Sequence, residues 1–441
     1  MIECRYNPID LRYKNTIGAV KQGELLTIRI EINNALPCTS VLYKEFDDPT
    51  HTEIYRKMAK VSDDGEFSLY EVSYKPIIGL YWYCFELEGC APKRFVGVGA
   101  DNKPCLFKSN PFWWQLTVYD NQYKTPDWLN KGVMYHIFVD RFCSLGQVIP
   151  YEDKYLREWG QQPNYKPSSN GKILNNDFFG GNINGIISKL DYLATLNVKV
   201  IYLSPIFSAY SNHKYDTEDY ETIDSMFGSE KDFKQLCKEA ESRGMSIMLD
   251  GVFNHTGVNS KYFNRSGKWG DGGAYNDQSS PYYDWYKFTD WNNKKYQSWW
   301  DFDTLPVLNP RSSSLQEYFA GKKGIVAKWL RLGARGWRLD VVDEIADCML
   351  DKIVYRAKNV KRDSVILGEV WEDASNKKDY GVRRRYFLGR QLDSVMNYPM
   401  RTAILNFVAT GNNSLFNSTV FMILNNYPKE VRDNLMNMLS T

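Results

Sequence analysis

The sequence predicts a chain of two architectures, an all-β sandwich followed by a (β/α)8 (TIM) barrel. In residues 1–125, short stretches that alternate apolar and polar side chains recur between turn signals, as in antiparallel sheets. From residue 126 on, short apolar strands alternate with amphipathic helices, which is typical of a parallel sheet covered by helices. The connection over about residues 255–310 lacks such periodicity, so we expect an excursion subdomain after the third barrel strand.

The first region, residues 1–125, is predicted to be an Ig-like sandwich. An Asp-Gly turn signal at residues 64–65 precedes its clearest alternating stretch. The strand candidates are residues 25–32, 67–74, 79–86 and 113–119. The region holds no specific motif, and glucan binding is a hypothesis for it.

The second region, residues 126–441, is predicted to repeat a strand–helix unit. The strand candidates are residues 133–139, 198–203, 246–252, 336–341, 365–370 and 394–398, and the helix candidates are residues 183–196, 231–243, 315–332 and 343–357. Such a series indicates a (β/α)8 barrel or a large doubly wound sheet. Because no G-x-G-x-x-G follows a strand, the dinucleotide-binding version is disfavoured.

The composition excludes several classes of protein. Lys+Arg number 55 and Asp+Glu 53, so the net charge of +2 favours neither a nucleic-acid surface nor an acidic tail. The mean hydropathy is −0.49 and no apolar run reaches about 18 residues, so we expect no membrane span. With four His and no H-E-x-x-H, a zinc site is not expected.

We expect a cytoplasmic location. Residues 1–10 carry charges and lack an apolar stretch, so no secretory signal is visible. The eight cysteines form no C-x-x-C pair, which favours reduced thiols. Secretion with disulfides is the alternative if the N-terminus is trimmed.

Ionisable residues gather at the predicted ends of the barrel strands, where the chemistry of parallel barrels takes place. Asp340 ends the fourth strand and Glu369 the fifth, so their backbones should lie about 4.8 Å apart. That geometry suits two carboxyls about 5–5.5 Å apart, the spacing of a retaining glycosidase. One carboxylate would attack the anomeric carbon, and the other would protonate the leaving oxygen.

The neighbours of this pair indicate a role for each member. Arg338 lies on the same strand face as Asp340, and a nearby guanidinium keeps a carboxylate ionised, as a nucleophile requires. Glu369 precedes Val370 and Trp371, an apolar setting that would keep it protonated as an acid. The alternative is a structural Arg338–Asp340 ion pair, which the other ionisable residues at strand ends disfavour.

The supply of aromatic residues exceeds what one core needs. Flat rings stack on the C–H faces of sugars, and their polar edges bond hydroxyls. The candidates are Trp113, Trp114, Tyr282, Tyr283, Trp285, Trp291, Trp299 and Trp300. Core packing is the alternative for any single ring, and only the clustering in the excursion segment favours a sugar groove.

Several stretches resemble motifs of the α-amylase family of glycoside hydrolases (glycoside hydrolase family 13), and they occur in that family's order. They are residues 133–142 (VMYHIFVDRF), 211–216 (SNHKYD), 250–255 (DGVFNH), 305–309 (LPVLN), 336–340 (GWRLD) and 368–371 (GEVW). The first stretch and LPVLN are similar to the neopullulanase, cyclomaltodextrinase and amylopullulanase group. The resemblance covers roughly residues 130–441.

The resemblance implies a retaining hydrolase of α-1,4 glucosidic bonds, with α-1,6 bonds as an alternative. The implied substrates are starch-derived glucans, pullulan or cyclodextrins, cleaved through a covalent glycosyl-enzyme. By position, Asp340 matches the family's nucleophile, Glu369 its general acid/base and Arg338 the residue that orients the nucleophile. Substrate-binding groups are matched by His213, Tyr215 (a stacking platform), His255, Glu344 and Trp371, and supporting residues by Asp216, Asp250 and Asn254.

The end of the sequence departs from the family pattern. The family carries a third carboxylate, an Asp that follows a His near the end of the seventh barrel strand. Residues 434–441 resemble the run that leads into this pair, so we expect a barrel truncated in the seventh strand and an inactive fragment of a longer enzyme. A non-catalytic, glucan-binding homologue is the alternative. An unrelated barrel enzyme of the aldolase type is disfavoured, because no Schiff-base Lys or Gly-rich phosphate loop ends a strand.

A second departure concerns the acceptor side and the metal. Residues 343–344 are Asp-Glu where many amylases have Lys-His, which is closer to the neopullulanase type. Residues 143–146 lack the oxygen ligands of a calcium loop, and Asn182 stands where related sequences often have Asp. We therefore expect no required cofactor, with calcium as an alternative. The expected partner is an α-glucan, without nucleic acid or membrane, and a homodimer stays open because some relatives dimerise.

Overall fold

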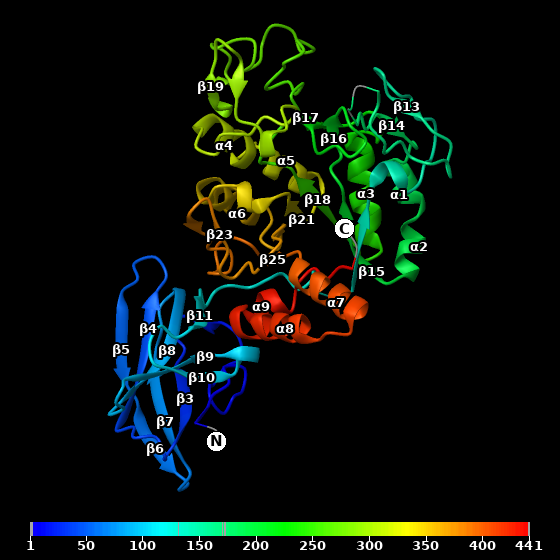
Figure 1. The fold of residues 1–441 in the computed structure, drawn as a ribbon. Helices are drawn as coiled ribbons and strands as arrows, with labels where there is room; N and C mark the ends of the chain where they lie inside the picture. Colours follow the sequence, from blue (N-terminus) through cyan, green and yellow to red (C-terminus); the bar gives the residue numbers. More distant parts are fainter. Residues whose placement is uncertain (1–2, 131, 170, 172, 440–441) are drawn as a thin grey trace. The chain divides into compact units, whose positions relative to one another are not determined.

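The computed structural model describes residues 3–130, 132–169, 171 and 173–439. The chain separates into two compact units (Figure 1): unit 1 comprises Met1–Thr125 with Val370–Thr441, and unit 2 comprises Pro126–Glu369. The domain bounds predicted from the sequence, 1–125 and 126–441, stay predictions. Of the helices in the described part of the chain, none combines the length and the apolar character needed to cross a bilayer.

The N-terminal part of unit 1 contains two sheets (Figure 1). One sheet has the order β1 (Cys4–Arg5), β3 (Leu26–Asn33), β7 (Phe67–Tyr74) and β6 (Ala59–Asp63). The other has the order β10 (Pro104–Phe107), β9 (Arg94–Val98), β8 (Gly79–Glu88), β11 (Trp114–Tyr119) and β2 (Val20–Lys21), with β4 (Ser40–Asp47) between β8 and β5 (Glu53–Lys57). Most pairs are antiparallel, and only β11 and β2 run parallel.

The alternation seen in the sequence produces the core of these two sheets. In β3 and β7, Ile28 lies opposite Val72 and Ile30 opposite Tyr70, and all four side chains are buried. They belong to one hydrophobic cluster with residues of β8 and β11, such as Tyr83, Phe85 and Trp114. A single core shared by two sheets is the arrangement expected of a sandwich.

The later part of unit 1 is mostly helical. It contains β23 (Lys378–Asp379), β24 (Val382–Arg383), β25 (Ser394–Val395), α7 (Tyr398–Thr410), α8 (Ser414–Asn426) and α9 (Lys429–Arg432). The predicted strand 394–398 is shorter than expected, because Asn397 caps α7 by accepting a bond from the Met400 N–H. Arg383 pairs with Asp48 at 2.8 Å, which ties this part to the sheets.

Residues near the end of the chain pair with β25. Met436 forms a parallel bridge with Met396, and its N–H donates to the carbonyl of Val395 over 3.1 Å. A strand in this position would lie next to β25, as predicted for a seventh barrel strand. The predicted truncation also involves residues 440–441, which lie outside the described residues, and it stays a prediction.

Unit 2 is built around parallel strands. The order is β12 (Val133–Ile137), β15 (Val198–Leu203), β18 (Ser246–Gly251), β21 (Gly336–Leu339) and β22 (Val365–Gly368), and neighbours in this order pair in parallel. Every residue of the last three strands is buried, since helices cover this type of sheet. This order is the one predicted for a TIM barrel.

The helices of unit 2 follow the strands, with two breaks that the periodicity did not predict. They are α1 (Ile183–Ser188), α2 (Leu190–Thr195), α3 (Glu230–Ser242), α4 (Ser313–Ala320), α5 (Ile325–Leu332) and α6 (Asp347–Val360). The predicted helix 315–332 is two helices, because the chain turns at Gly321 and Gly324. A Cβ at Gly324 would lie 2.6 Å from the carbonyl oxygen of Tyr318, so only glycine fits this turn. The predicted helix 183–196 is likewise divided at Lys189.

The predicted excursion after β18 is a compact layer with little regular structure. Its elements are η3 (Tyr283–Trp285), β19 (Phe288–Asp290), β20 (Lys295–Tyr296) and η4 (Trp299–Asp301). Many of its aromatic residues pack on one another around the buried Phe263, whose ring lies 4.7 Å from those of Tyr286 and Tyr296. Core packing, the alternative considered above, therefore accounts for the rings packed around Phe263, whereas Trp300 of the same excursion is exposed.

Shorter elements connect the remaining strands. Between β12 and α1 lie η2 (Val139–Arg141), β13 (Tyr155–Leu156) and β14 (Asp177–Phe178), and between β15 and α3 lie β16 (Phe207–Ala209) and β17 (Thr217–Ile223). The turn η5 (Val342–Glu344) follows β21. The loops at the carboxyl ends of the strands thus carry most of the irregular structure of unit 2.

Candidate active site

Three carboxylates stand at the carboxyl ends of neighbouring strands of unit 2. Asp250 lies near the end of β18, and Asp340 and Glu369 directly follow β21 and β22. The ladder continues through them, because the Asp340 N–H donates to the carbonyl of Gly251 and the Glu369 N–H to that of Leu339, each over 3.1 Å. The parallel register therefore fixes all three residues at one edge of the sheet.

One guanidinium contacts all three carboxylates. Arg338 Nη1 lies 2.7 Å from Asp340 Oδ1 and 2.9 Å from Asp250 Oδ1, and Nη2 lies 2.8 Å from Glu369 Oε2. All four residues are buried. The pair predicted from the sequence is thus brought together, with Arg338 bonded to both of its members.

Burial and the neighbouring guanidinium have opposite effects on the pKa of Asp340. Burial raises the pKa of Asp340 to about 8, and the effect of the Arg338 guanidinium, which lowers it, is smaller. Burial also raises the pKa of Asp250. The guanidinium of Arg338 thus acts on the pKa of Asp340 in the predicted direction, but burial outweighs it, and the predicted ionised state of Asp340 stays a prediction.

Glu369 is held from the strand beside it. Its Oε2 accepts a hydrogen bond of 2.8 Å from the backbone N–H of Val341 and faces Arg338 Nη2. Val341 has a left-handed φ of 37°, which is unfavourable for a β-branched side chain. The strained turn after Asp340 therefore directs a backbone donor at the second carboxylate.

Two residues that the sequence analysis missed, Tyr202 and His136, connect Asp250 to β15 and β12. Tyr202 in β15 donates its hydroxyl proton to Asp250 Oδ2, and the ring of His136 in β12 stacks on Tyr202 at 4.5 Å. Burial lowers the pKa of His136 to about 4, so this ring is neutral at physiological pH. The only signal in the sequence is a polar ring near the end of each apolar strand.

His255 is a buried, neutral residue that positions its neighbours. It is 1% exposed, and burial lowers its pKa to about 4. Its Nε2 lies 3.1 Å from the carbonyl oxygen of Tyr215, so the neutral ring carries its proton on Nε2 and donates it there. The amide of Asn254 lies 3.4 Å from the other ring nitrogen. Both residues therefore brace the loop that carries Tyr215.

The loop over residues 211–216 brings the Tyr215 hydroxyl to Asp250 and places the His213 ring next to that of Tyr215. The Tyr215 hydroxyl donates to Asp250 Oδ2 over 3.1 Å, and the rings of His213 and Tyr215 lie 5.8 Å apart. Asp216 closes the loop by accepting bonds from the hydroxyl and N–H of Ser211. Lys214, which lies between His213 and Tyr215 in the sequence, is buried and pairs with Asp224 at 2.6 Å. The predicted supporting role of Asp216 thus corresponds to a bond that shapes this loop.

Two more of the predicted substrate-binding residues are Glu344 and Trp371. Glu344 is half-buried and ends η5, four residues after Asp340 in the chain. Trp371 belongs to unit 1, and 43% of it is exposed. Their roles stay predictions.

Asn182, which was considered in connection with calcium, and Asp140 are both bonded to protein groups. Asn182 caps α1 by accepting from the Gly185 N–H at 2.7 Å, and it donates to the carbonyl of Leu145 at 3.0 Å. Asp140 accepts from the N–H groups of Phe179 and Gly180. Among the described residues, no three His, Cys, Asp or Glu side chains are grouped as metal ligands would be.

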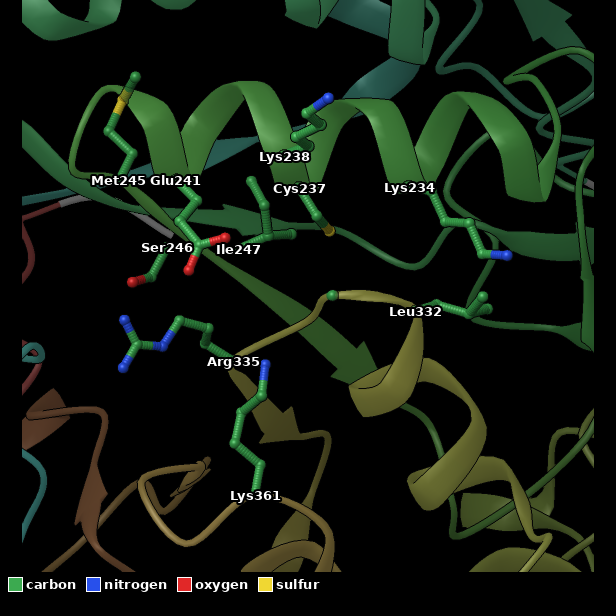
Figure 2. Close-up of a pocket in the computed structure, with 11 residues that line it drawn as sticks. Lys234, Cys237, Lys238, Glu241, Met245, Ser246, Ile247, Leu332, Arg335 and Lys361 are labelled. Atoms are coloured by element: carbon green, nitrogen blue, oxygen red, sulfur yellow. The ribbon is translucent and has the colours of Figure 1, made fainter.

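A separate hollow of about 220 Å³ lies at the opposite end of the strands (Figure 2). It is bordered by Lys234 and Lys238 of α3, by Ser246 at the start of β18 and by Arg335 before β21. Chemistry in parallel barrels takes place at the carboxyl ends of the strands, so this hollow is not part of the candidate site.

Comparisons with known proteins agree with this geometry. A family model described as "Alpha amylase, catalytic domain" matches residues 137–440. An amylopullulanase of Thermoanaerobacterium saccharolyticum is 36% identical over 92% of this chain and 34% of its own length. A cyclomaltodextrinase of Geobacillus thermopakistaniensis (strain MAS1) is 32% identical over 87% of this chain and 62% of its own length. A solved cyclomaltodextrinase structure, 26% identical, covers 99% of this chain and 71% of its own with a TM-score of 0.62. The chain thus spans about a third of the amylopullulanase.

Proposed function

The chain belongs to the α-amylase family, and from its buried carboxylates we propose that it forms the catalytic part of a retaining α-glucan hydrolase. The observation that carries this proposal is the contact of Arg338 with both Asp340 and Glu369. A purely structural ion pair would need one carboxylate, whereas a retaining glycosidase needs two carboxyl groups side by side. The names of the relatives, amylopullulanase and cyclomaltodextrinase, support starch-type glucans, pullulan or cyclodextrins as substrates.

In the proposed first step, an oxygen of Asp340 attacks the anomeric carbon of a glucosyl unit. The bond from that carbon to the glycosidic oxygen breaks, and Glu369 transfers its proton to this leaving oxygen.

In the second step, a water molecule gives a proton to Glu369 and displaces Asp340 from the anomeric carbon. Two displacements at one carbon retain the α configuration. Arg338 donates to both carboxylates, so it holds them at fixed positions through both steps.

The covalent step is tested by trapping it. A fluorinated maltosyl fluoride, which forms the glycosyl-enzyme faster than water releases it, should add one maltosyl group to the whole protein, and peptide mapping should place it on Asp340. Asp340→Asn should remain unlabelled, whereas Asp191→Asn, a substitution on exposed α2, should label like the wild type. Labelling of another residue, or a first product of β configuration, would overturn the assignment.

The linkage is tested with pullulan, in which maltotriose units are joined by α-1,6 bonds. Hydrolysis of its α-1,4 bonds yields panose, whereas hydrolysis of its α-1,6 bonds yields maltotriose. We expect panose from the whole protein, because the Asp-Glu pair at residues 343–344 resembles the neopullulanase type. Maltotriose as the main product would show that the α-1,6 alternative applies.

A further inference from the structure

Three rings stack in a row from the candidate site to the surface of the excursion. The buried ring of His255 lies 5.3 Å from that of Trp299 at an angle of 19°, and Trp299 lies 5.1 Å from Trp300 at 21°. His255 bonds the backbone of Tyr215, whose hydroxyl bonds Asp250. The outermost ring, Trp300, is 58% exposed. We call these three residues the ring ladder.

The turn that presents Trp300 is held in an unfavourable conformation. Trp300 and Asp301 have left-handed φ angles of 48° and 62°; aspartate tolerates this region, whereas a tryptophan seldom adopts it. The turn is closed by bonds from the Trp299 N–H to the carbonyl of Leu305 and from the Leu305 N–H to the carbonyl of Phe302, both 2.9 Å. Backbone strain of this kind persists where the surrounding structure enforces it, and it is found at ligand-binding sites.

Two further bonds fix the tip of the same turn. Arg265 pairs with the carboxylate of Asp303 at 3.0 Å, and the Tyr296 hydroxyl donates to the carbonyl of Asp303 at 2.6 Å. The turn is thus anchored on the packed part of the excursion. A rigid support of this kind lowers the entropy that a ligand must give up when it binds.

Trp300 and Phe302 present large apolar surfaces to the solvent. Phe302 is 54% exposed, whereas Trp285, an aromatic residue of the same excursion, is 3% exposed and donates its Nε1 proton to Ser314. The Nε1–H of Trp299 is buried, and among the described residues it has no acceptor within hydrogen-bond range. A flat exposed ring is suited to a sugar, whose C–H face can stack on it.

We propose that Trp300, backed by Trp299, is a stacking platform for a glucosyl unit of the α-glucan, outside the units that flank the cleaved bond. The choice of a glucan rests on the proposed function, while the platform itself rests on the ring ladder and the strained turn. The C–H face of the sugar lies on the Trp300 ring, and Phe302 borders it. Long chains reach this platform and short ones do not.

The first test compares chain lengths in the whole protein. Trp300→Ala should raise KM for maltoheptaose about tenfold, since an aromatic contact contributes on the order of one power of ten in affinity, and should leave KM for maltotriose within about twofold. The matched control is Trp269→Ala, another exposed tryptophan of the excursion, which should change neither value. Equal losses on both substrates would overturn the platform.

A second test separates binding from a structural role. Trp300→Gly suits the left-handed φ, so it should keep or raise the melting temperature while it abolishes the preference for long chains. A lower melting temperature with an unchanged preference would assign Trp300 to folding instead.

A third test does not depend on turnover. In an Asp340→Asn background, maltoheptaose binding measured by calorimetry should weaken about tenfold on Trp300→Ala. If the protein binds maltoheptaose through Trp300 but hydrolyses no glucan, the proposed function fails and the platform stands. If it hydrolyses glucans and maltoheptaose binds equally well with and without Trp300, the platform fails and the function stands.

Discussion

The backbone N–H of Val341 donates a hydrogen bond of 2.8 Å to Oε2 of Glu369. Val341 directly follows Asp340, so the residue next to the proposed nucleophile holds the proposed acid/base. Val341 has a left-handed φ of 37°, so this arrangement requires a strained backbone at Val341. The relative position of the two carboxylates is therefore set by backbone as well as by Arg338, and the following predictions depend on it.

Asp340→Asn should lower the hydrolysis of maltooligosaccharides by about 10³-fold or more, because the amide cannot form the glycosyl-enzyme. It should also change how stability depends on pH. Burial raises the pKa of Asp340 to about 8 from its unfolded value near 3.9, so the native state binds the extra proton between these values. The stability of the wild type relative to Asp340→Asn should therefore fall as the pH rises from about 4 to about 8. Melting temperatures of both proteins across this range check the prediction, and parallel curves would contradict it.

Glu369→Gln should slow natural glucans more than substrates with good leaving groups. An activated aryl leaving group departs with little protonation, so the loss of the acid matters less for it. We expect Glu369→Gln to slow glycosyl-enzyme formation from maltopentaose by a factor at least about 100 times larger than the factor for an aryl maltoside. Pre-steady-state measurement of aryl release provides the comparison. Losses of equal size would argue against the acid role of Glu369.

Tyr202→Phe should shift the pH profile of kcat/KM. The Tyr202 hydroxyl bonds Asp250, and this bond favours the charged form of the carboxylate. Without it, the pKa of Asp250 should rise, and the acidic limb of the profile should move to higher pH. Tyr355→Phe, on the exposed face of α6, serves as the control with an unchanged limb. An unshifted profile for Tyr202→Phe would mean that Asp250 does not affect the reacting groups.

Gly324→Ala should destabilise the protein by about 1–3 kcal/mol. The added Cβ would meet the carbonyl oxygens of Tyr318 and Phe319 at 2.6 and 2.8 Å, and backbone atoms cannot move aside easily. Gly272→Ala is the matched control, because nothing lies within 4 Å of its Cβ. Chemical denaturation of both variants measures the difference. Equal stabilities would show that the turn between α4 and α5 adapts.

Chelation should leave activity and melting temperature unchanged. The side chains of Asn182 and Asp140 are already bonded to backbone groups of the loops they join, so they do not need a cation to hold those loops. The measurement is glucan hydrolysis and thermal unfolding with EDTA and with added Ca²⁺. A loss that Ca²⁺ restores would establish the calcium alternative.

Much of the candidate site could be predicted from periodicity alone. Apolar strands that end in Asp340 and Glu369 must, in a parallel sheet, bring those residues to one edge. Arg338, two residues before Asp340, shares its strand face for the same reason. Tyr202 could not be predicted, because a tyrosine inside an apolar strand looks like a core residue until its hydroxyl partner is known.

Other features needed contacts that local patterns do not encode. The apolar periodicity of residues 315–332 runs through Gly321 and Gly324, so it predicts one helix where the chain forms two. The ring ladder joins His255 to Trp299 across more than forty positions of sequence. Which aromatic residues of the excursion pack inside it, as Trp285 does, and which remain exposed, as Trp300 does, depends on that folding.

By itself the sequence determined the parallel strands of unit 2 and the residues at their ends, because side-chain periodicity reports which faces are buried. Only the tertiary structure decided the pKa of Asp340. The pKa of Asp340 depends on burial and on its distances to Arg338, Asp250 and Glu369 together, and Asp250 lies ninety positions away in the chain. Spacing along one strand shows one carboxyl group next to a guanidinium, whereas three strands side by side place three carboxyl groups around that guanidinium.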